Sequence, residues 1–162
     1  MSRSKKLLVQ DVYDPNKMHS LVVDEDELVE KVIKAFAEQP SLRGIFVVDK
    51  EKAFKGVITR RDLLNWARIQ LGIGVDRREI SRAARMSEVI GELIRYAYAS
   101  TAKELVRQYS YRVYVKPEDS IISALNIMFL SDLIDIPVID GQGKIIGDLK
   151  LNEILNEIIK IL

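Results

Sequence analysis

Hydrophobic and polar positions follow one pattern twice along this chain. In each occurrence a short β-branched run is followed by acidic residues and then by apolar residues at helical spacing, which predicts a strand and then a helix. The predicted strands lie at 21–23 and 113–115. The helix positions that we expect to face a core are Leu28, Val32, Ile33 and Phe36 in the first occurrence, and Ile121, Ile122, Leu125, Met128 and Phe129 in the second.

Both occurrences continue with an apolar run, a polar turn, a second strand and a closing helix. In the second occurrence Gly141-Gln142-Gly143 suits a tight turn, because glycine tolerates positive φ. Each unit is therefore predicted to be β-α-β-β-α. The remaining strands are predicted at 45–49, 55–58, 136–140 and 144–147, and the closing helices from Asp62 onward and over 151–159.

The two units are copies of one another. Gly56 and Gly147 occupy equivalent positions 91 residues apart, as do Asp62 and Glu153. A unit of about 50 residues buries too little surface to be stable alone, so we expect the two to pack sheet to sheet as one body. The predicted fold class is α+β, with tandem duplicated units, two small packed sheets and a helical connector. We divide the chain into a leader at 1–17, a first unit at 18–71, the connector at 72–99 and a second unit at 100–162.

The first part of the connector carries a group of four arginines on an amphipathic helical pattern. Its apolar positions recur at helical spacing, while Arg77, Arg78, Arg82 and Arg85 lie mostly outside that stripe. Neighbouring glutamates dilute this charge, which favours a solvated helix face over a nucleic-acid patch. Nucleic-acid binding through the connector stays an alternative function.

Composition narrows the chemistry further. With 25 Lys+Arg against 24 Asp+Glu in 162 residues the net charge is +1, so any anion site must be local. The absence of cysteine excludes disulfides, thiolate nucleophiles and sulfur-bound metals, and a single histidine, His19, excludes a histidine metal cluster. No nucleotide-hydrolysis, dinucleotide or metalloprotease motif occurs, so we expect no enzyme activity and no cofactor. Without a secretory pattern or the ~20 apolar residues of a membrane span, we expect a cytoplasmic protein.

The segment 56–63 carries candidate ligand chemistry. We expect its strand to lead into a helix whose unpaired N–H groups attract anions. The Thr59 hydroxyl can contact a phosphate, and Arg60 and Arg61 can neutralise it. Asp62 can accept two ribose hydroxyls. The Thr-x-x-Asp spacing is also that of an ordinary helix capping box, so from these residues alone a nucleotide site and a helix cap both remain open.

The duplicated unit also resembles a known family. A strand ending in Val-Val-Asp or Val-Ile-Asp, a polar turn and the motif Gly-h-h-Thr-x-x-Asp-Leu, where h is apolar, are similar to those of CBS domains over about 18–71 and 100–162. Such domains occur as tandem pairs, called Bateman modules, in which two antiparallel sheets pack together and form clefts. Those clefts bind adenosine ligands such as AMP, ADP, ATP or S-adenosylmethionine. The resemblance therefore implies regulatory ligand binding rather than catalysis.

The resemblance further implies which residues bind. Thr59 and Asp62 match the motif residues that contact the phosphate and the ribose hydroxyls. The adenine is expected against the segment that precedes Val-Val-Asp. We therefore assign to the first cleft the ligand-binding residues Gly44, Ile45, Phe46, Ile58, Thr59, Arg60 and Asp62.

The second copy departs from the family motif. It has Lys150 in place of the threonine and Glu153 in place of the aspartate, so we expect one good site per chain, in the first cleft. The first copy has Phe46 where the second keeps the motif proline, and a phenylalanine can either close over an adenine or fill the pocket. The weaker second site is assigned to Ile136, Pro137, Lys150 and Glu153.

These observations predict a sensor module that binds an adenosine ligand and regulates a partner protein. A C-terminal apolar stripe packs either on the other unit or in a dimer, and the family resemblance makes a homodimer our expectation. The alternative is a ligand-free dimerisation scaffold or regulatory subunit, in which Thr59 only caps a helix. The stripe consists of Ile154, Leu155, Ile158, Ile159 and Leu162.

Overall fold

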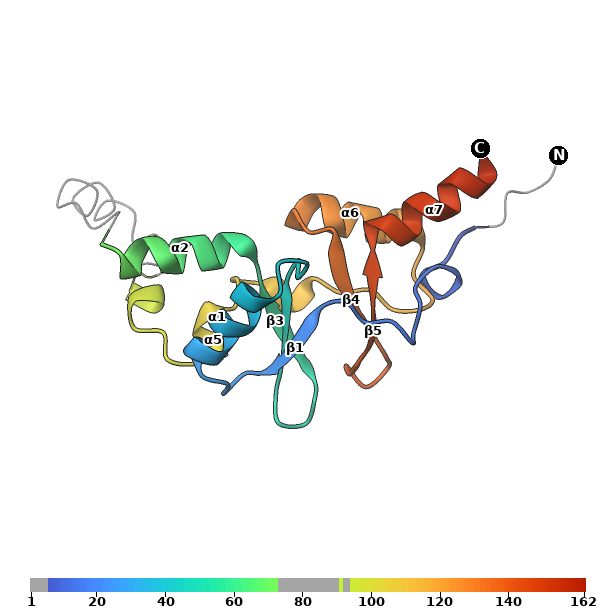
Figure 1. The fold of residues 1–162 in the computed structure, drawn as a ribbon. Helices are drawn as coiled ribbons and strands as arrows, with labels where there is room; N and C mark the ends of the chain where they lie inside the picture. Colours follow the sequence, from blue (N-terminus) through green and yellow to red (C-terminus); the bar gives the residue numbers. More distant parts are fainter. Residues whose placement is uncertain (1–5, 73–90, 92–93) are drawn as a thin grey trace.

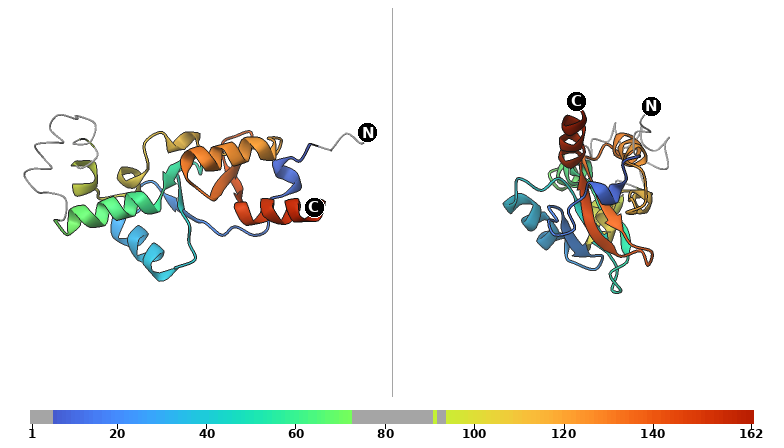
Figure 2. Two further views of the ribbon diagram at one scale, coloured as in Figure 1. Left: turned by 90° about the horizontal axis from the view of Figure 1, so that it is seen from above. Right: turned by 90° about the vertical axis from the view of Figure 1, so that its right-hand side faces the viewer.

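Two similar halves lie side by side along the long axis of the molecule (Figure 1, Figure 2). The computed structural model describes residues 6–72, 91 and 94–162. Most of the predicted connector, with Arg77, Arg78, Arg82 and Arg85, lies outside these residues. The α+β class and the repeated architecture predicted from the sequence are confirmed. Within the described residues, no helix combines the length and apolarity needed to cross a membrane.

The first half forms a three-stranded sheet. The chain runs through β1 (Leu21–Asp24), α1 (Val29–Glu38), β2 (Ile45–Val48), β3 (Phe54–Ile58) and α2 (Arg60–Gln70). Strand β2 lies in the middle, parallel to β1 and antiparallel to β3. The sheet is therefore mixed and not antiparallel as the family resemblance implied, because the helical crossover α1 returns the chain in the same direction.

The second half has a two-stranded sheet. The chain passes through α5 (Ala102–Leu105) and the 3₁₀ turn η2 (Ser110–Arg112), and then through α6 (Ile121–Ser131), β4 (Asp135–Ile139), β5 (Ile145–Lys150) and α7 (Leu151–Ile161). The strand predicted at 113–115 is wrong except for one parallel bridge from Val115 to Val138. The 3₁₀ turn directly precedes this bridge, and the backbone of Pro117 and Asp119 pairs with the leader instead.

Two of the α6 residues that were predicted to face the core are exposed instead. Ile122 and Phe129 are 71% and 86% exposed, whereas the buried positions of this helix are Ile121, Ala124 and Met128. The helix is apolar on almost every side, so spacing alone did not select its inner face. In α1 the buried positions are Val29 and Val32, and Leu28 is the half-exposed N-cap.

Each half is completed by the segment that precedes the other half. The leader, through the turn η1 (Val9–Asp11), packs on the second half: the Val9 N–H donates to the Asp119 carbonyl at 2.8 Å, and Val9 is fully buried. In the same way the Ala102 N–H donates to the Glu27 carbonyl of the first half at 2.8 Å. The leader is therefore part of the fold, a role that sequence analysis did not assign to it.

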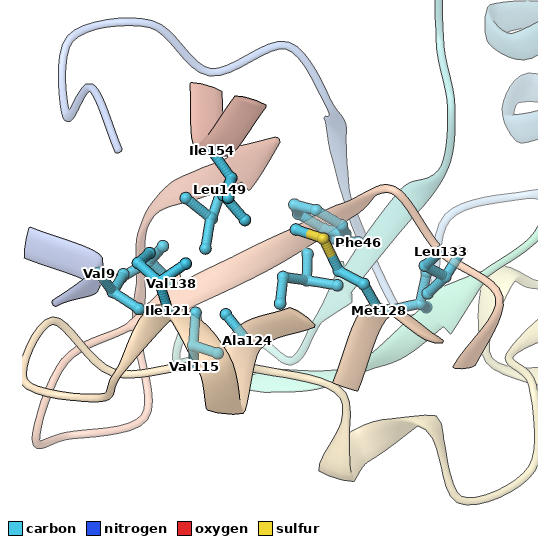
Figure 3. Close-up of a cluster of buried hydrophobic side chains, with 12 residues drawn as sticks. Val9, Phe46, Val115, Ile121, Ala124, Met128, Leu133, Val138, Leu149 and Ile154 are labelled. Carbon is cyan, nitrogen blue, oxygen red and sulfur yellow. The ribbon is translucent and has the colours of Figure 1, made fainter. Parts of the chain in front are cut away.

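The hydrophobic core joins both halves. Phe46 and Val57 of the first half lie in one cluster with residues of the leader and the second half (Figure 3). The two hairpin turns also meet, since the Phe54 N–H donates to the Gly143 carbonyl at 2.9 Å. Burying one large apolar side chain contributes about 1.5–3 kcal/mol, so this shared cluster favours a single folding unit.

The two repeated glycines allow these crossing segments to approach the sheets. A Cβ atom on Gly56 would lie 2.4 Å from Val106 Cγ1 and 2.7 Å from Ser110 Oγ. A Cβ atom on Gly147 would lie 2.8 Å from the ring of Tyr13 in the leader. Any side chain at either position would push the crossing segment off its strand.

Candidate functional site

Thr59 and Asp62 form a capping box at the start of α2. The Thr59 backbone N–H and hydroxyl each donate to Asp62 Oδ2 at 2.7 Å, and the Asp62 N–H donates to Thr59 Oγ1 at 3.3 Å. Both residues are buried, with exposed fractions of 5% and 4%. Of the two interpretations that the sequence left open, the helix cap is present in the structure.

The other carboxylate oxygen of Asp62 contacts the end of the connector. The Tyr96 hydroxyl donates to Asp62 Oδ1 at 2.7 Å, and Arg95 Nη2 donates to the Tyr96 hydroxyl at 3.1 Å. Arg95 Nη1 donates in turn to the Val106 carbonyl at 2.6 Å. A ribose hydroxyl would therefore share Asp62 with Tyr96 or displace it, and the expected ribose contact stays a prediction.

A pocket of about 380 Å³ opens beside Thr59. The first half contributes Thr59 and three arginines, and the second half and its preceding segment contribute the rest. Asp62 does not line this pocket. The lining residues are Arg43, Thr59, Arg60, Arg61, Arg107, Asp132, Leu133 and Ile134.

The pocket is strongly cationic. Four arginines face a single lining carboxylate, Asp132, and within the described part of the chain no arginine forms an ion pair. Arg107 Nη1 donates to the Ser131 carbonyl at 2.7 Å, which holds its guanidinium at the pocket wall. Guanidinium groups are donors that bind phosphate, whereas the single hydroxyl proton of Thr59 is already donated to Asp62.

The residues expected to hold adenine do not line this pocket. Ile45, Phe46 and Ile58 are fully buried, and Gly44 is buried beside Val57. Phe46 lies in the shared core with Met128 and Leu133 (Figure 3), so it fills the interior between the halves. A contact of these residues with a ligand stays a prediction.

Comparison with known proteins identifies the repeated unit. The family model for the CBS domain matches twice, at residues 9–68 and 102–160, which together make up more than half of the chain. The chain belongs to the CBS domain family. Its two halves are a CBS domain pair, as the sequence motif predicted.

Solved structures of CBS domain pairs have the same fold. The structure of CBSX2 in complex with AMP superposes with a TM-score of 0.72 at 22% identity, covering 96% of this chain and 98% of that one. A CBS domain-containing protein from Thermotoga maritima gives 0.67 at 23% identity, covering 96% of each chain. The cytosolic domain of the Mg²⁺ channel MgtE in complex with ATP gives 0.60 at 19% identity, covering 96% of this chain and 50% of that one. A search of curated protein sequences finds no match.

In the second CBS domain Lys150, the cation at the motif threonine position, forms ion pairs with carboxylates of the same domain. Lys150 Nζ lies 2.9 Å from Asp148 Oδ1 and 3.0 Å from Glu153 Oε1, and it also donates to the Lys17 carbonyl at 3.4 Å. Burial opposes the charge of this ammonium, but the two carboxylates outweigh burial and raise the pKa of Lys150. The two other residues assigned to this site, Ile136 and Pro137, are buried in β4.

The leader covers the same corner of the second CBS domain. The Asp14 N–H donates to Glu153 Oε2 at 3.1 Å, and the His19 and Ser20 N–H groups donate to Asp148 Oδ2 at 3.1 and 3.2 Å. His19 thus contacts the second CBS domain through its backbone N–H. These bonds, with that from Lys150 to the Lys17 carbonyl, place the leader against the motif residues of the second CBS domain.

Two buried carboxylates lie behind this corner. Asp135 and Asp148 stand where the first CBS domain has Gly44 and Val57. Asp135 Oδ2 accepts the Ser20 hydroxyl at 2.7 Å, while its Oδ1 is buried without a hydrogen-bond partner. Burial, followed by the nearby charge of Asp148, raises the pKa of Asp135 to about 8. Among the described residues, no group of three acidic or histidine side chains is arranged to hold a metal ion.

Sequence reasoning missed five residues of the pocket. Arg43 lies in the loop before β2, and Arg107, Asp132, Leu133 and Ile134 come from the second half of the chain. For Arg107 the signal was the repeat itself: since the leader packs on the second domain, the segment around Arg107 packs equivalently on the first. That relation becomes usable only once the exchange of segments between the halves is known.

Proposed function

We propose that this chain is a cytoplasmic, non-catalytic regulatory module that binds an adenosine ligand in the pocket beside Thr59 and acts on a partner protein. The observation that carries this proposal is the arginine-lined pocket at a helix cap, built from both CBS domains. Its volume of about 380 Å³ falls in the range of small-molecule sites. The AMP and ATP complexes of CBSX2 and MgtE support an adenine nucleotide as the ligand class.

The composite pocket suggests how binding would regulate. Arg43, Arg60 and Arg61 belong to the first CBS domain, whereas Asp132 and Leu133 belong to the second. A ligand that contacts both sides favours the relative placement of the domains that it fits best. The partner protein would then bind one arrangement of the two domains more tightly than the other.

A thermal-shift panel followed by calorimetry tests this function. AMP, ADP, ATP and S-adenosylmethionine are each added to the purified full chain. A ligand at one hundred times its dissociation constant should stabilise the folded state by about 2.7 kcal/mol. If no adenosine compound shifts the unfolding temperature or binds in calorimetry, the ligand-free scaffold becomes the better description.

We further propose that the chain forms a homodimer through apolar helix surfaces. Phe129 and Leu130 of α6 are 86% and 82% exposed, and Ile159 of α7 is 67% exposed. Figure 1 shows both helices at the end of the β4–β5 hairpin that lies away from its turn. Burial of such residues favours association. Light scattering should give twice the monomer mass, and Phe129→Ser with Leu130→Ser should restore the monomer; a monomeric parent chain would contradict the proposal.

A further inference from the structure

We propose that the arginine pocket selects a nucleotide with two or three linked phosphates over a nucleoside monophosphate or S-adenosylmethionine. This inference rests on the proposed function, since it concerns the same pocket. It starts from the four guanidinium groups of Arg43, Arg60, Arg61 and Arg107, which line one pocket of about 380 Å³. None of them is in an ion pair within the residues that the structure describes.

The number of cations exceeds what one phosphate can neutralise. A phosphate monoester carries about two negative charges near neutral pH, and Asp132 is the one carboxylate of the lining. Two or three linked phosphates bring more charge and extend over a longer distance. Such a chain can engage arginines from separate segments: the loop before β2, the first turn of α2 and the segment after α5.

Two of these segments are held in place before any ligand arrives. Arg107 is half-buried, and its guanidinium is fixed by the 2.7 Å hydrogen bond to the Ser131 carbonyl. Its remaining N–H groups are available to an anion, because a guanidinium has five. Arg60 and Arg61 lie on the first turn of α2, whose start is fixed by the Thr59 cap. Preorganised donors lose less entropy on binding.

The same charges disfavour the other adenosine ligands. The sulfonium of S-adenosylmethionine would add a positive charge beside four guanidinium groups. Adenosine itself would leave all four unneutralised. The ribose offers little compensation, because both oxygens of Asp62 already accept hydrogen bonds from Thr59 and Tyr96.

Calorimetry on the full chain tests this selectivity. ATP, ADP, AMP, S-adenosylmethionine and inorganic tripolyphosphate are titrated in EDTA, at low and at moderate salt. One additional charge-assisted contact changes affinity about tenfold, so ATP and ADP should bind at least about tenfold more tightly than AMP. Their affinity should also fall more steeply with salt, because more charges are paired.

Matched arginine variants locate the effect. Arg43→Gln removes a cation without any described side-chain bond, so its fold should be unaffected, and it should lower ATP affinity about tenfold with little effect on AMP. Arg107→Gln should lower ATP affinity to a similar extent, again with little effect on AMP. Arg68→Gln, an exposed position in the last turn of the same helix as Arg60, is the control and should leave all affinities unchanged.

The outcomes separate the two proposals. Equal affinities for AMP and ATP, or equal loss in Arg43→Gln and Arg68→Gln, would overturn the phosphate selectivity and leave the adenosine site standing. Binding of tripolyphosphate as tight as that of ATP would support the polyphosphate preference and overturn recognition of adenosine. Absence of binding by every compound would overturn both.

Discussion

The Tyr96 hydroxyl donates a 2.7 Å hydrogen bond to Oδ1 of Asp62, and so connects the end of the inter-domain connector to the helix cap beside the pocket. Both residues are buried, with exposed fractions of 2% and 4%. Tyr96 also receives a hydrogen bond from Arg95, and the Arg95 guanidinium lies 4.8 Å from the centre of its ring. The family motif aspartate is thus shared between a structural contact and its expected ligand contact.

Replacing Tyr96 with phenylalanine should separate these two uses of Asp62. The variant frees Oδ1 without removing the ring, so a ribose hydroxyl no longer competes with the tyrosine and nucleotide affinity should rise. Stability should fall by about 1.5–3 kcal/mol, the range for a hydrogen bond to a charged group. Calorimetry with ATP and urea unfolding measure the two effects.

Tyr98→Phe serves as the control for this prediction. Tyr98 is two residues further along and 82% exposed, so the change should affect neither affinity nor stability. If Tyr96→Phe lowers stability but leaves ATP affinity unchanged, Asp62 does not receive the ribose.

The motif residues of the two CBS domains should respond differently to truncation. Thr59→Ala and Asp62→Ala should each weaken nucleotide binding about tenfold, because either change disrupts the cap that fixes the start of α2, where Arg60 and Arg61 line the pocket. Glu153→Ala should change binding little, because Glu153 is engaged by Lys150 and the leader. Calorimetry is combined with urea unfolding, since loss of the Thr59 cap alone costs about 1 kcal/mol. Equal loss from Asp62→Ala and Glu153→Ala would mean that the chain does not have one dominant site.

Phe46 should matter for stability. It is fully buried in the cluster that joins both CBS domains (Figure 3), so Phe46→Ala should destabilise the fold by about 3–5 kcal/mol. Phe129→Ala, which removes an exposed aromatic ring of α6, should cost far less in the monomer. Urea unfolding of both variants checks this, and a small loss for Phe46→Ala would mean that the two domains do not share a core.

Features set by local sequence were predictable. The Thr59–Asp62 spacing defines a cap within one helical turn, and Asp49 and Asp140 each close a hairpin turn through side-chain bonds to nearby N–H groups. The repeat of these local features also predicted the CBS domain pair. Each depends on residues within a few positions of one another, which is why the order of residues was sufficient.

Features set by contacts between distant segments were not predictable. Ile122 of α6 is apolar at the right spacing for a core position, but the leader and β4 cover the opposite side of that helix. Arg107 reaches the pocket because the start of the second domain crosses the first, where the Arg107 N–H donates to the Val57 carbonyl. The proximity of the buried carboxylates Asp135 and Asp148 could likewise not be predicted, because it depends on how β4 and β5 pair.

The pKa of Asp135, raised to about 8, makes stability depend on pH in a defined direction. Between its ordinary value of 3.8 and about 8, the folded chain keeps a proton that the unfolded chain releases. Stability therefore falls as pH rises through this window, by at most about 1.4 kcal/mol per pH unit from this group. Above about 8 both states are ionised, and the penalty no longer grows.

Asp135→Asn should remove this penalty, because an amide matches the neutral acid in shape and still accepts from the Ser20 hydroxyl. The variant should be more stable than the parent chain at pH 8, and the gain should shrink steadily toward pH 4. Asp140→Asn should have the opposite effect on stability. Turn N–H groups lower the pKa of Asp140, so its charge stabilises the fold at neutral pH. This stabilisation is lost at acid pH, where the carboxylate is protonated. Urea unfolding from pH 2 to 9 measures both variants, since the effect of Asp140 is lost only below its ordinary pKa of 3.8. A gain for Asp135→Asn that does not change with pH would show that Asp135 is not protonated in the folded chain, and that the leader instead rests on a pair of ionised carboxylates.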